Sequence, residues 1–155
     1  MQNLLSYLNE FLLFRNFVEV IGGLDNTLLL LVISLPIGFV LSLIFALGRV
    51  STNKFISKPI ASYIFVIRGT PLLVQIYLIY FGLGSIEFIR ESFLWYLLRE
   101  PFWCGVLALT INTVAYGSEI FRGGIQSVTK GQIESGLSLG FNKIDLLRKI
   151  IFPIA

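Results

Sequence analysis

Four polar or charged side chains lie inside stretches that are otherwise apolar, and these residues have the types and spacing to do chemistry. They are Arg68, Asn112, Tyr116 and Glu119. A charged side chain in a lipid-embedded segment costs at least about 2.5 kcal/mol on insertion scales, so such groups are candidates for a functional role. The role that they suggest is direct contact with a polar substrate inside a membrane protein.

Arg68 is the deepest charge in the sequence. It follows Lys58 by ten residues, which would place it about 15 Å deep in a straight helix. Two other interpretations stay open: the side chain snorkels to the surface, or it pairs with an acid and fixes the packing of the helices.

Asn112, Tyr116 and Glu119 are spaced at i, i+4 and i+7 and therefore share one helical face. In lipid this face is expected to turn inward. Asn112 could instead serve only to bond a neighbouring helix. Glu119 could likewise meet only a basic residue, either Arg122 or Arg68.

Gly69, Thr70 and Pro71 predict a break in the apolar segment that contains Arg68. Thr70 can cap a helix, and Pro71 suits the first position of a new one. Backbone groups exposed at such a break are tolerated where they are buried in protein or line a wet cavity. The alternative is a plain proline kink.

The elements that must position these residues are predicted to be membrane helices. The chain has 155 residues, of which 55% are hydrophobic and 14% charged, and its mean hydropathy is +0.83. These values indicate a single all-α domain, 1–155, of a polytopic membrane protein. We expect three spans, at 26–48, 59–86 and 101–120, with a kink near Pro36 and Gly38, and an interfacial helix within 1–20.

A pair of short helices is predicted after the third span, over 129–153. Gly140 suits the left-handed turn that ends the first helix. Asn142 and Asp145 have the spacing of a capping box at the start of the second, and Pro153 is expected to stop it. This compact knob, which includes Glu134, could fit a groove in a soluble partner. Alternatively, it is an ordinary juxtamembrane helix held by lipid headgroups.

Several kinds of chemistry are excluded by composition. The sequence contains no histidine and a single cysteine, Cys104, so we predict neither a histidine-based metal site nor an internal disulfide. The segment Gly124 to Lys130 resembles a phosphate-binding loop only loosely, because Thr129 replaces its second glycine. We therefore predict no cofactor, no ATP hydrolysis by this chain and no binding of nucleic acid.

Charge placement predicts the orientation of the chain. The segments on one side of the three spans carry eight Lys and Arg residues, and those on the other side carry three with six acids. The positive-inside rule then places the 129–153 knob in the cytoplasm and the N-terminus outside.

Three motifs resemble those of one family. The run from Arg68 to Gln75 is similar to the hallmark of the permease subunits of bacterial polar amino-acid ABC importers, such as those for histidine, arginine and glutamine. The segment from Asn112 to Ile125 is also similar to that family's. Glu134 to Pro153 resembles its cytoplasmic "EAA" loop, with Ser135 and Gly136 standing where two alanines are typical.

The resemblance implies a MetI-like permease fold in the bacterial inner membrane. It also adds Thr70 and Gln75 to Arg68, Asn112, Tyr116 and Glu119 as candidates to line the path of the substrate. Its implied partners are an ABC ATPase, a second permease subunit and an extracytoplasmic amino-acid-binding protein. The EAA-like loop is then the coupling loop that contacts the ATPase, and it contains Glu134, Gly140, Asp145 and Pro153. Because such permeases usually have five spans, we expect a shortened chain, which leaves open a non-transporting remnant or an interaction-only membrane protein. An unrelated three-span channel is the remaining alternative.

Overall fold

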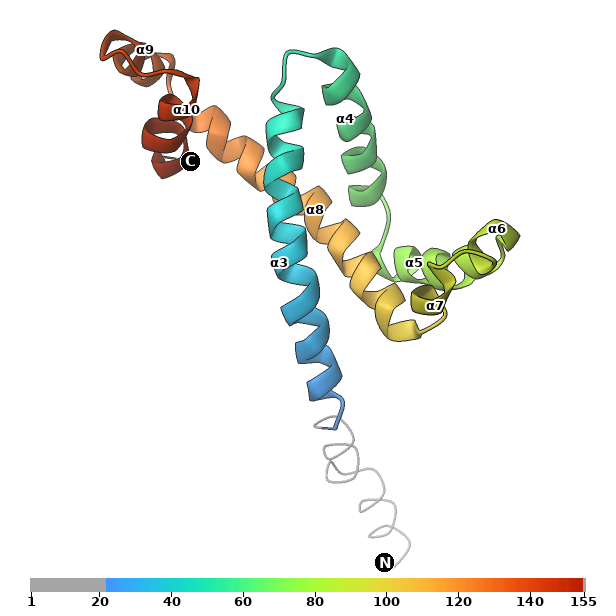
Figure 1. Ribbon diagram of the computed structural model, residues 1–155. Helices are drawn as coiled ribbons and strands as arrows, with labels where there is room; N and C mark the ends of the chain where they lie inside the picture. The colour runs from blue at the N-terminus through green and yellow to red at the C-terminus, as the bar shows by residue number, and fades with distance from the viewer. Residues whose placement is uncertain (1–21, 155) are drawn as a thin grey trace, which may run out of the picture.

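The computed structural model describes residues 22–154, and this part of the chain is helical, which confirms the predicted all-α class. The helix expected within 1–20 lies outside the described residues. Two long helices, α3 (Leu24–Arg49) and α8 (Pro101–Ser127), cross each other at the centre of the molecule (Figure 1). Helix α4 (Lys54–Arg68) runs back beside them after a short turn.

Small residues let α3 and α8 approach closely. Ser34, Gly38, Ser42 and Ala46 repeat every fourth position of α3, so they share one face, and all four are buried. The Ser42 hydroxyl donates to the Thr113 carbonyl of α8 at 3.1 Å. Close backbone contact of this kind, with small residues and interhelical hydrogen bonds, is what holds helices together in lipid. Helix α3 continues through Pro36 without a break.

Helix α4 is held at its start and at its middle. Asn53 caps it by accepting from the Phe55 amide at 2.9 Å. Farther along, the Tyr63 hydroxyl donates to the Ile111 carbonyl of α8 at 2.6 Å. The Asn53 cap fixes the start of α4, and the Tyr63 bond fixes α4 against α8, so the two together set the position of its last residue, Arg68.

The predicted second span, 59–86, is not one straight helix. Helix α4 ends at Arg68, and α5 (Leu72–Tyr77) with the π-helical turn η1 (Leu78–Gly82) leaves at an angle of 106°. The predicted break is therefore confirmed. Thr70 does not cap α5, because its hydroxyl donates to the Val66 and Ile67 carbonyls of α4, and Pro71 stands before the first residue of α5.

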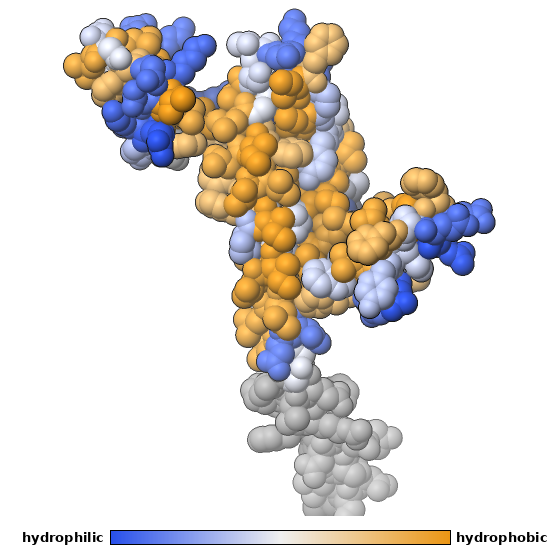
Figure 2. Space-filling model, in the orientation of Figure 1, coloured by the Kyte–Doolittle hydropathy of each residue, from blue (hydrophilic) through white to orange (hydrophobic). Residues whose placement is uncertain are grey.

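Within residues 22–154, α3 and α8 are long and apolar enough to cross a membrane, and the bent pair would supply a third crossing. Helix α8 runs to Ser127, beyond the expected end at 120. Two short helices, α6 (Glu87–Arg90) and α7 (Trp95–Leu98), connect η1 to α8. Figure 2 shows an apolar middle, with hydrophilic side chains gathered at the ends.

The knob consists of α9 (Lys130–Ser138) and a second helical stretch made of α10 (Lys143–Leu146), η2 (Leu147–Ile151) and α11 (Phe152–Ile154). Gly140 has a φ of 81°, as its predicted left-handed turn requires. Asn142 accepts from the Ile144 and Asp145 amides and so caps α10. A reciprocal capping box that the sequence interpretation missed joins Thr129 to Gln132.

Pro153 lies inside α11, one residue before the end of the described chain at Ile154, so its predicted role in stopping the second helix of the knob stays a prediction. The knob also has a small core of its own. Gly136 is buried, and a Cβ there would meet the side-chain ends of Leu146 and Ile150.

Candidate functional site

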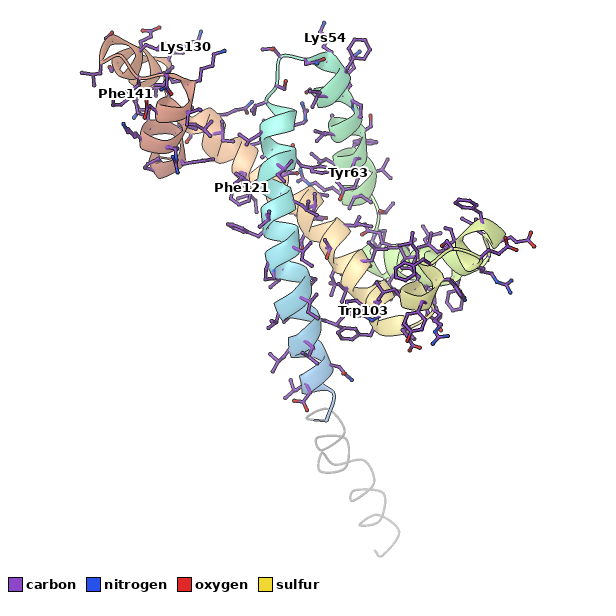
Figure 3. All side chains as sticks on the ribbon, in the orientation of Figure 1. Lys54, Tyr63, Trp103, Phe121, Lys130 and Phe141 are labelled. Carbon is purple, nitrogen blue, oxygen red and sulfur yellow. The ribbon has the colours of Figure 1, made fainter. Side chains whose placement is uncertain are left out.

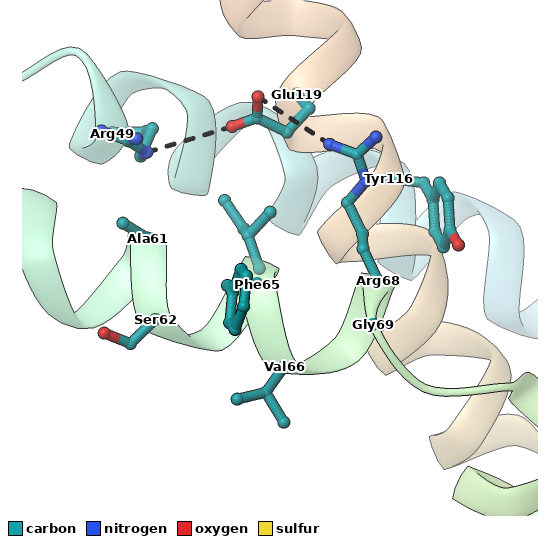
Figure 4. Close-up of a pocket in the computed structure, with 10 residues that line it drawn as sticks. Arg49, Ala61, Ser62, Phe65, Val66, Arg68, Gly69, Tyr116 and Glu119 are labelled. Carbon is teal, nitrogen blue, oxygen red and sulfur yellow. Dashed lines mark ion pairs between the residues drawn. The ribbon is translucent and has the colours of Figure 1, made fainter.

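A cleft of about 950 Å³ lies between the end of α3, the second half of α4 and the middle of α8 (Figure 4). Its polar lining includes Arg49, Arg68, Tyr116 and Glu119, and its apolar lining includes Phe65. Three of the predicted site residues therefore face one space. Arg49 joins them although the sequence interpretation counted it only as a charge at the end of a span.

Glu119 is the centre of the charges in this cleft. Its carboxylate oxygen Oε2 lies 2.7 Å from Arg122 Nη2, in an ion pair between neighbouring turns of α8. Arg68 Nη1 lies 4.0 Å from the same oxygen, and Arg49 Nε lies 3.9 Å from Oε1. The carboxylate is largely covered, with 19% of the side chain exposed. Arg68 thus pairs with an acid, as one of the two alternatives proposed.

The two arginines that line the cleft also have partners besides Glu119. Arg68 lies over the Tyr116 ring, with its guanidinium carbon 5.3 Å from the ring centre. Arg49 donates to the Ser57 hydroxyl at 3.3 Å. Both arginines stand beyond hydrogen-bonding distance of Glu119, so part of their donor capacity faces the cleft.

The remaining predicted residues gather at the helix break, not in the cleft. Gln75 is 5% exposed. Its Nε2 lies 2.7 Å from the Ile67 carbonyl oxygen, 3.0 Å from the Thr70 carbonyl oxygen and 2.9 Å from the Thr70 hydroxyl, so its two N–H donors are shared among three oxygens. Asn112 Nδ2 donates to Gln75 Oε1 at 3.2 Å. The structure therefore divides the six predicted residues into a cleft group and a break group.

The two groups explain how one face of α8 is used. Asn112 contacts the break, while Tyr116 and Glu119, one and two turns later, line the cleft. Asn112 does bond a neighbouring helix, which was the open alternative for this residue. The tyrosine is 44% exposed, so its ring presents an open surface to the cleft.

The knob places its predicted residues on an open surface. Glu134 and Gly140 are exposed, and Asp145 pairs with Lys149 at 3.0 Å. Apolar side chains also stand out on the knob: Leu137, Leu139 and Ile144 are between half and three quarters exposed. Lys130 and Phe141 mark this surface in Figure 3.

Long apolar helices, a charged cleft between them and a projecting helical knob define a polytopic membrane protein with a polar interior. A family model described as "Binding-protein-dependent transport system inner membrane component" matches residues 17–155. The chain belongs to this family.

Similar proteins carry related descriptions. The chain is 46% identical over 143 residues to the octopine transport system permease protein OccM of Rhizobium radiobacter, covering 92% of this chain and 58% of the relative. It is 46% identical over 134 residues to the histidine/lysine/arginine/ornithine transport system permease protein HisM of Escherichia coli (strain K12), covering 86% and 56%. The arginine ABC transporter permease protein ArtM of Haemophilus influenzae is 41% identical over 144 residues, covering 92% and 63%.

A solved structure described as an amino acid ABC transporter with histidines has a similar fold. The TM-score is 0.74 at 40% sequence identity, over 92% of this chain and 64% of that one. The chain therefore spans somewhat less than two thirds of the length of these relatives.

Proposed function

We propose that this chain is the membrane-spanning permease subunit of an ATP-driven importer that carries a polar or charged amino acid across the bacterial inner membrane. The charged cleft carries this proposal. An amino acid presents both a carboxylate and an ammonium group, and the cleft offers guanidinium groups from Arg49 and Arg68 beside the Glu119 carboxylate. The similarity to permeases named for octopine, arginine and histidine transport supports the same substrate class.

The substrate path proposed here includes Arg68, Tyr116 and Glu119, with Arg49 added. Their low-dielectric surroundings strengthen a charge–charge contact with a solute relative to the same contact in water. The Tyr116 ring supplies a face on which a cationic group can rest, as Arg68 rests on it in this structure.

The knob is proposed to lie in the cytoplasm and to dock on an ABC ATPase. The ends of α3 and α4 nearest the knob carry Arg49, Lys54 and Lys58, and the knob carries four more basic residues. The opposite end, around α6 and α7, carries acids as well as arginines (Figure 3). The lysine and arginine bias favours the basic end as cytoplasmic.

The exposed Leu137, Leu139 and Ile144 supply apolar contacts for the ATPase around Glu134 and Asp145. Closure of the ATPase on ATP would then move the knob and, through α8, the cleft. A second permease subunit and an extracytoplasmic amino-acid-binding protein complete the proposed assembly.

Uptake measurements test this function directly. The gene is deleted in its host, and uptake of labelled arginine, histidine, glutamine and glutamate is compared with uptake of a labelled sugar. We expect saturable, ATP-dependent uptake of at least one amino acid to disappear and to return with the restored gene. Loss of none of the four, with normal protein levels in the parent, would contradict the proposal.

A further inference from the structure

The break between α4 and α5 is held by the Thr70 hydroxyl, which bonds back to α4, and by the buried side chain of Gln75 from α5. The Gln75 amide nitrogen has three oxygen atoms around it at 2.7–3.0 Å, and all three belong to residues on the two sides of Arg68 and Gly69. A helix that ends inside a membrane protein leaves carbonyl groups without intrahelical partners, and these carbonyls must be satisfied internally. Gln75 donates to one of them, that of Ile67, and to the Thr70 carbonyl within the break.

The hydrogen bonds of Gln75 reach residues on both sides of Arg68, the arginine that lines the cleft. Ile67 precedes Arg68 directly, and Thr70 follows it after one glycine. The amide therefore fixes the backbone on both sides of Arg68, at the point where the chain turns by 106°. Without this link, α5 would be joined to α4 only through residues 69–71, where the Thr70 hydroxyl bonds back to the Val66 and Ile67 carbonyls.

Asn112 sets the direction of the Gln75 amide. Its Nδ2 donates to Gln75 Oε1, so the oxygen end of the glutamine points toward α8 and the nitrogen end toward the break. The same helix carries Tyr116 and Glu119. The Tyr116 ring centre lies 5.3 Å from the Arg68 guanidinium carbon, and Glu119 Oε2 lies 4.0 Å from Arg68 Nη1. The chain Asn112–Gln75–break thus couples the backbone of Arg68 to the helix that holds its side-chain partners.

We propose that Gln75, oriented by Asn112, is a positioning residue that holds the helix break and thereby places the Arg68 guanidinium in the cleft. Gln75 does not itself touch the substrate. This inference rests on the proposed function for its transport consequence, whereas the geometry of the break can be tested without it.

The first experiment measures the bend in the full chain, reconstituted in lipid with its transport partners. Spin labels are attached at Phe55 and Leu78, both exposed, after Cys104→Ala. A straight helix would separate these positions by about 35 Å, and the bent arrangement keeps them much closer. We expect one narrow, short distance distribution, which broadens toward longer distances in Gln75→Met. An unchanged distribution in Gln75→Met would overturn the proposal.

The control variant is Thr110→Val, which removes a buried hydroxyl that has no hydrogen-bond partner in the structure. It alters α8, the helix that carries Asn112, but leaves the hydrogen bonds of Asn112 and Gln75 intact. The spin-label distance distribution of this variant should therefore match that of the parent protein. Broadening in Thr110→Val as large as that in Gln75→Met would show that any polar-to-apolar change in this region loosens the break, and it would also overturn the proposal.

The second experiment separates positioning from general damage. Gln75→Glu keeps the shape, but its carboxylate cannot donate to the three oxygens. For whichever of the four labelled amino acids the parent takes up, we expect KM to rise about tenfold, the usual effect of losing a buried hydrogen bond, with a smaller change in the maximal rate. In an Arg68→Gln background the same change should raise KM no further, because residues that act as one unit are not additive.

An additive loss in the double variant would overturn the positioning role. If the parent protein takes up none of the four labelled amino acids, the proposed function is wrong. The distance measurement still decides whether Gln75 holds the break.

Discussion

At the scale of single residues, Glu119 holds together charges from three parts of the chain. Three guanidinium groups lie within 4.0 Å of one carboxylate: Arg49 ends α3, Arg68 ends α4, and Arg122 lies one turn along α8. A partly buried charge is tolerated when it is paired, and the removal of one partner leaves the others uncompensated. Glu119 therefore fixes both the charge and the shape of the cleft.

Glu119→Gln is expected to lower amino-acid uptake at least about tenfold. The amide keeps the size of the side chain but loses its negative charge, so the three guanidinium groups repel one another in a region of low dielectric. The measurement is uptake of labelled amino acids at equal amounts of membrane protein, together with the ATPase activity of the assembled transporter.

Glu100→Gln is the matched control, because it makes the same chemical change in an exposed pair with Arg99 just before α8. Exposed pairs contribute little, at most about 1 kcal/mol, so uptake and the protein level should stay normal. Equal loss of uptake in a Glu119→Gln variant and in a Glu100→Gln variant would contradict a special role for the cleft cluster.

The sequence alone predicted which residues would matter here but not how they meet. An arginine in an apolar segment needs a partner, and Glu119 was one of few acids available, so their pairing was a stated alternative. Arg49 was missed because its position at the end of an apolar run indicates only membrane topology. Its contact with Glu119 depends on how α3 crosses α8, and no local pattern encodes that crossing.

At the scale of elements, the crossing of α3 and α8 depends on the absence of side chains. A Cβ on Gly117 would lie 2.9 Å from Ser42 Cβ and still closer to its hydroxyl, and a Cβ on Gly38 would lie 2.7 Å from Thr113 Cβ. Since real Cβ atoms are not found so close, either substitution must push the two helices apart. The cleft lies beside this crossing, so its width follows from these glycines.

Gly117→Ala is expected to destabilise the folded protein by about 1–3 kcal/mol through overpacking. Thermal unfolding of the purified protein in detergent measures the effect. Gly123→Ala on the same helix meets nothing within 4 Å, and its stability should stay level or rise by up to about 1 kcal/mol because alanine favours helix. Similar melting temperatures for the two variants would refute the close-packing argument.

Gly140→Val is expected to weaken docking of the ATPase at least about tenfold while the protein still enters the membrane. A β-branched residue at a φ of 81° is strained by roughly 1–2 kcal/mol or more, so the two helices of the knob must change their relative direction. Co-purification of the ATPase with the tagged permease measures docking. Gly131→Val, at an open position of α9, should co-purify as the parent does.

The knob and the break differ in how far the sequence determines them. A glycine before an asparagine cap predicts the turn at Gly140, because both residues act locally. The break at Pro71 was also predictable, but its angle and its link to Gln75 were not. They depend on Asn112, which lies 37 positions away in the chain, and hydrophobic periodicity carries no information about such a contact.

At the scale of the whole molecule, the described chain has an apolar middle between two polar ends. Lys54 and Lys130 lie at one end, and Trp103 lies toward the other (Figure 3). The end with the lysines also carries the knob, and the other end carries α6 and α7 with exposed Phe88 and Tyr96. Aromatic side chains of this kind favour the interface between lipid and water.

The proposed orientation of the chain can be measured by labelling single cysteines in intact cells. In a Cys104→Ala background, which removes the buried native thiol, Ser92→Cys places a thiol between α6 and α7, and Ser135→Cys places one on the exposed side of the knob. Both changes conserve charge, so the lysine and arginine bias that sets the topology is untouched. A membrane-impermeant maleimide should label the Ser92→Cys protein from outside and should label the Ser135→Cys protein only after the inner membrane is opened. Labelling of Ser135→Cys in intact cells would place the knob outside, where no ATP-driven subunit could reach it, and would overturn the proposed coupling as well as the orientation.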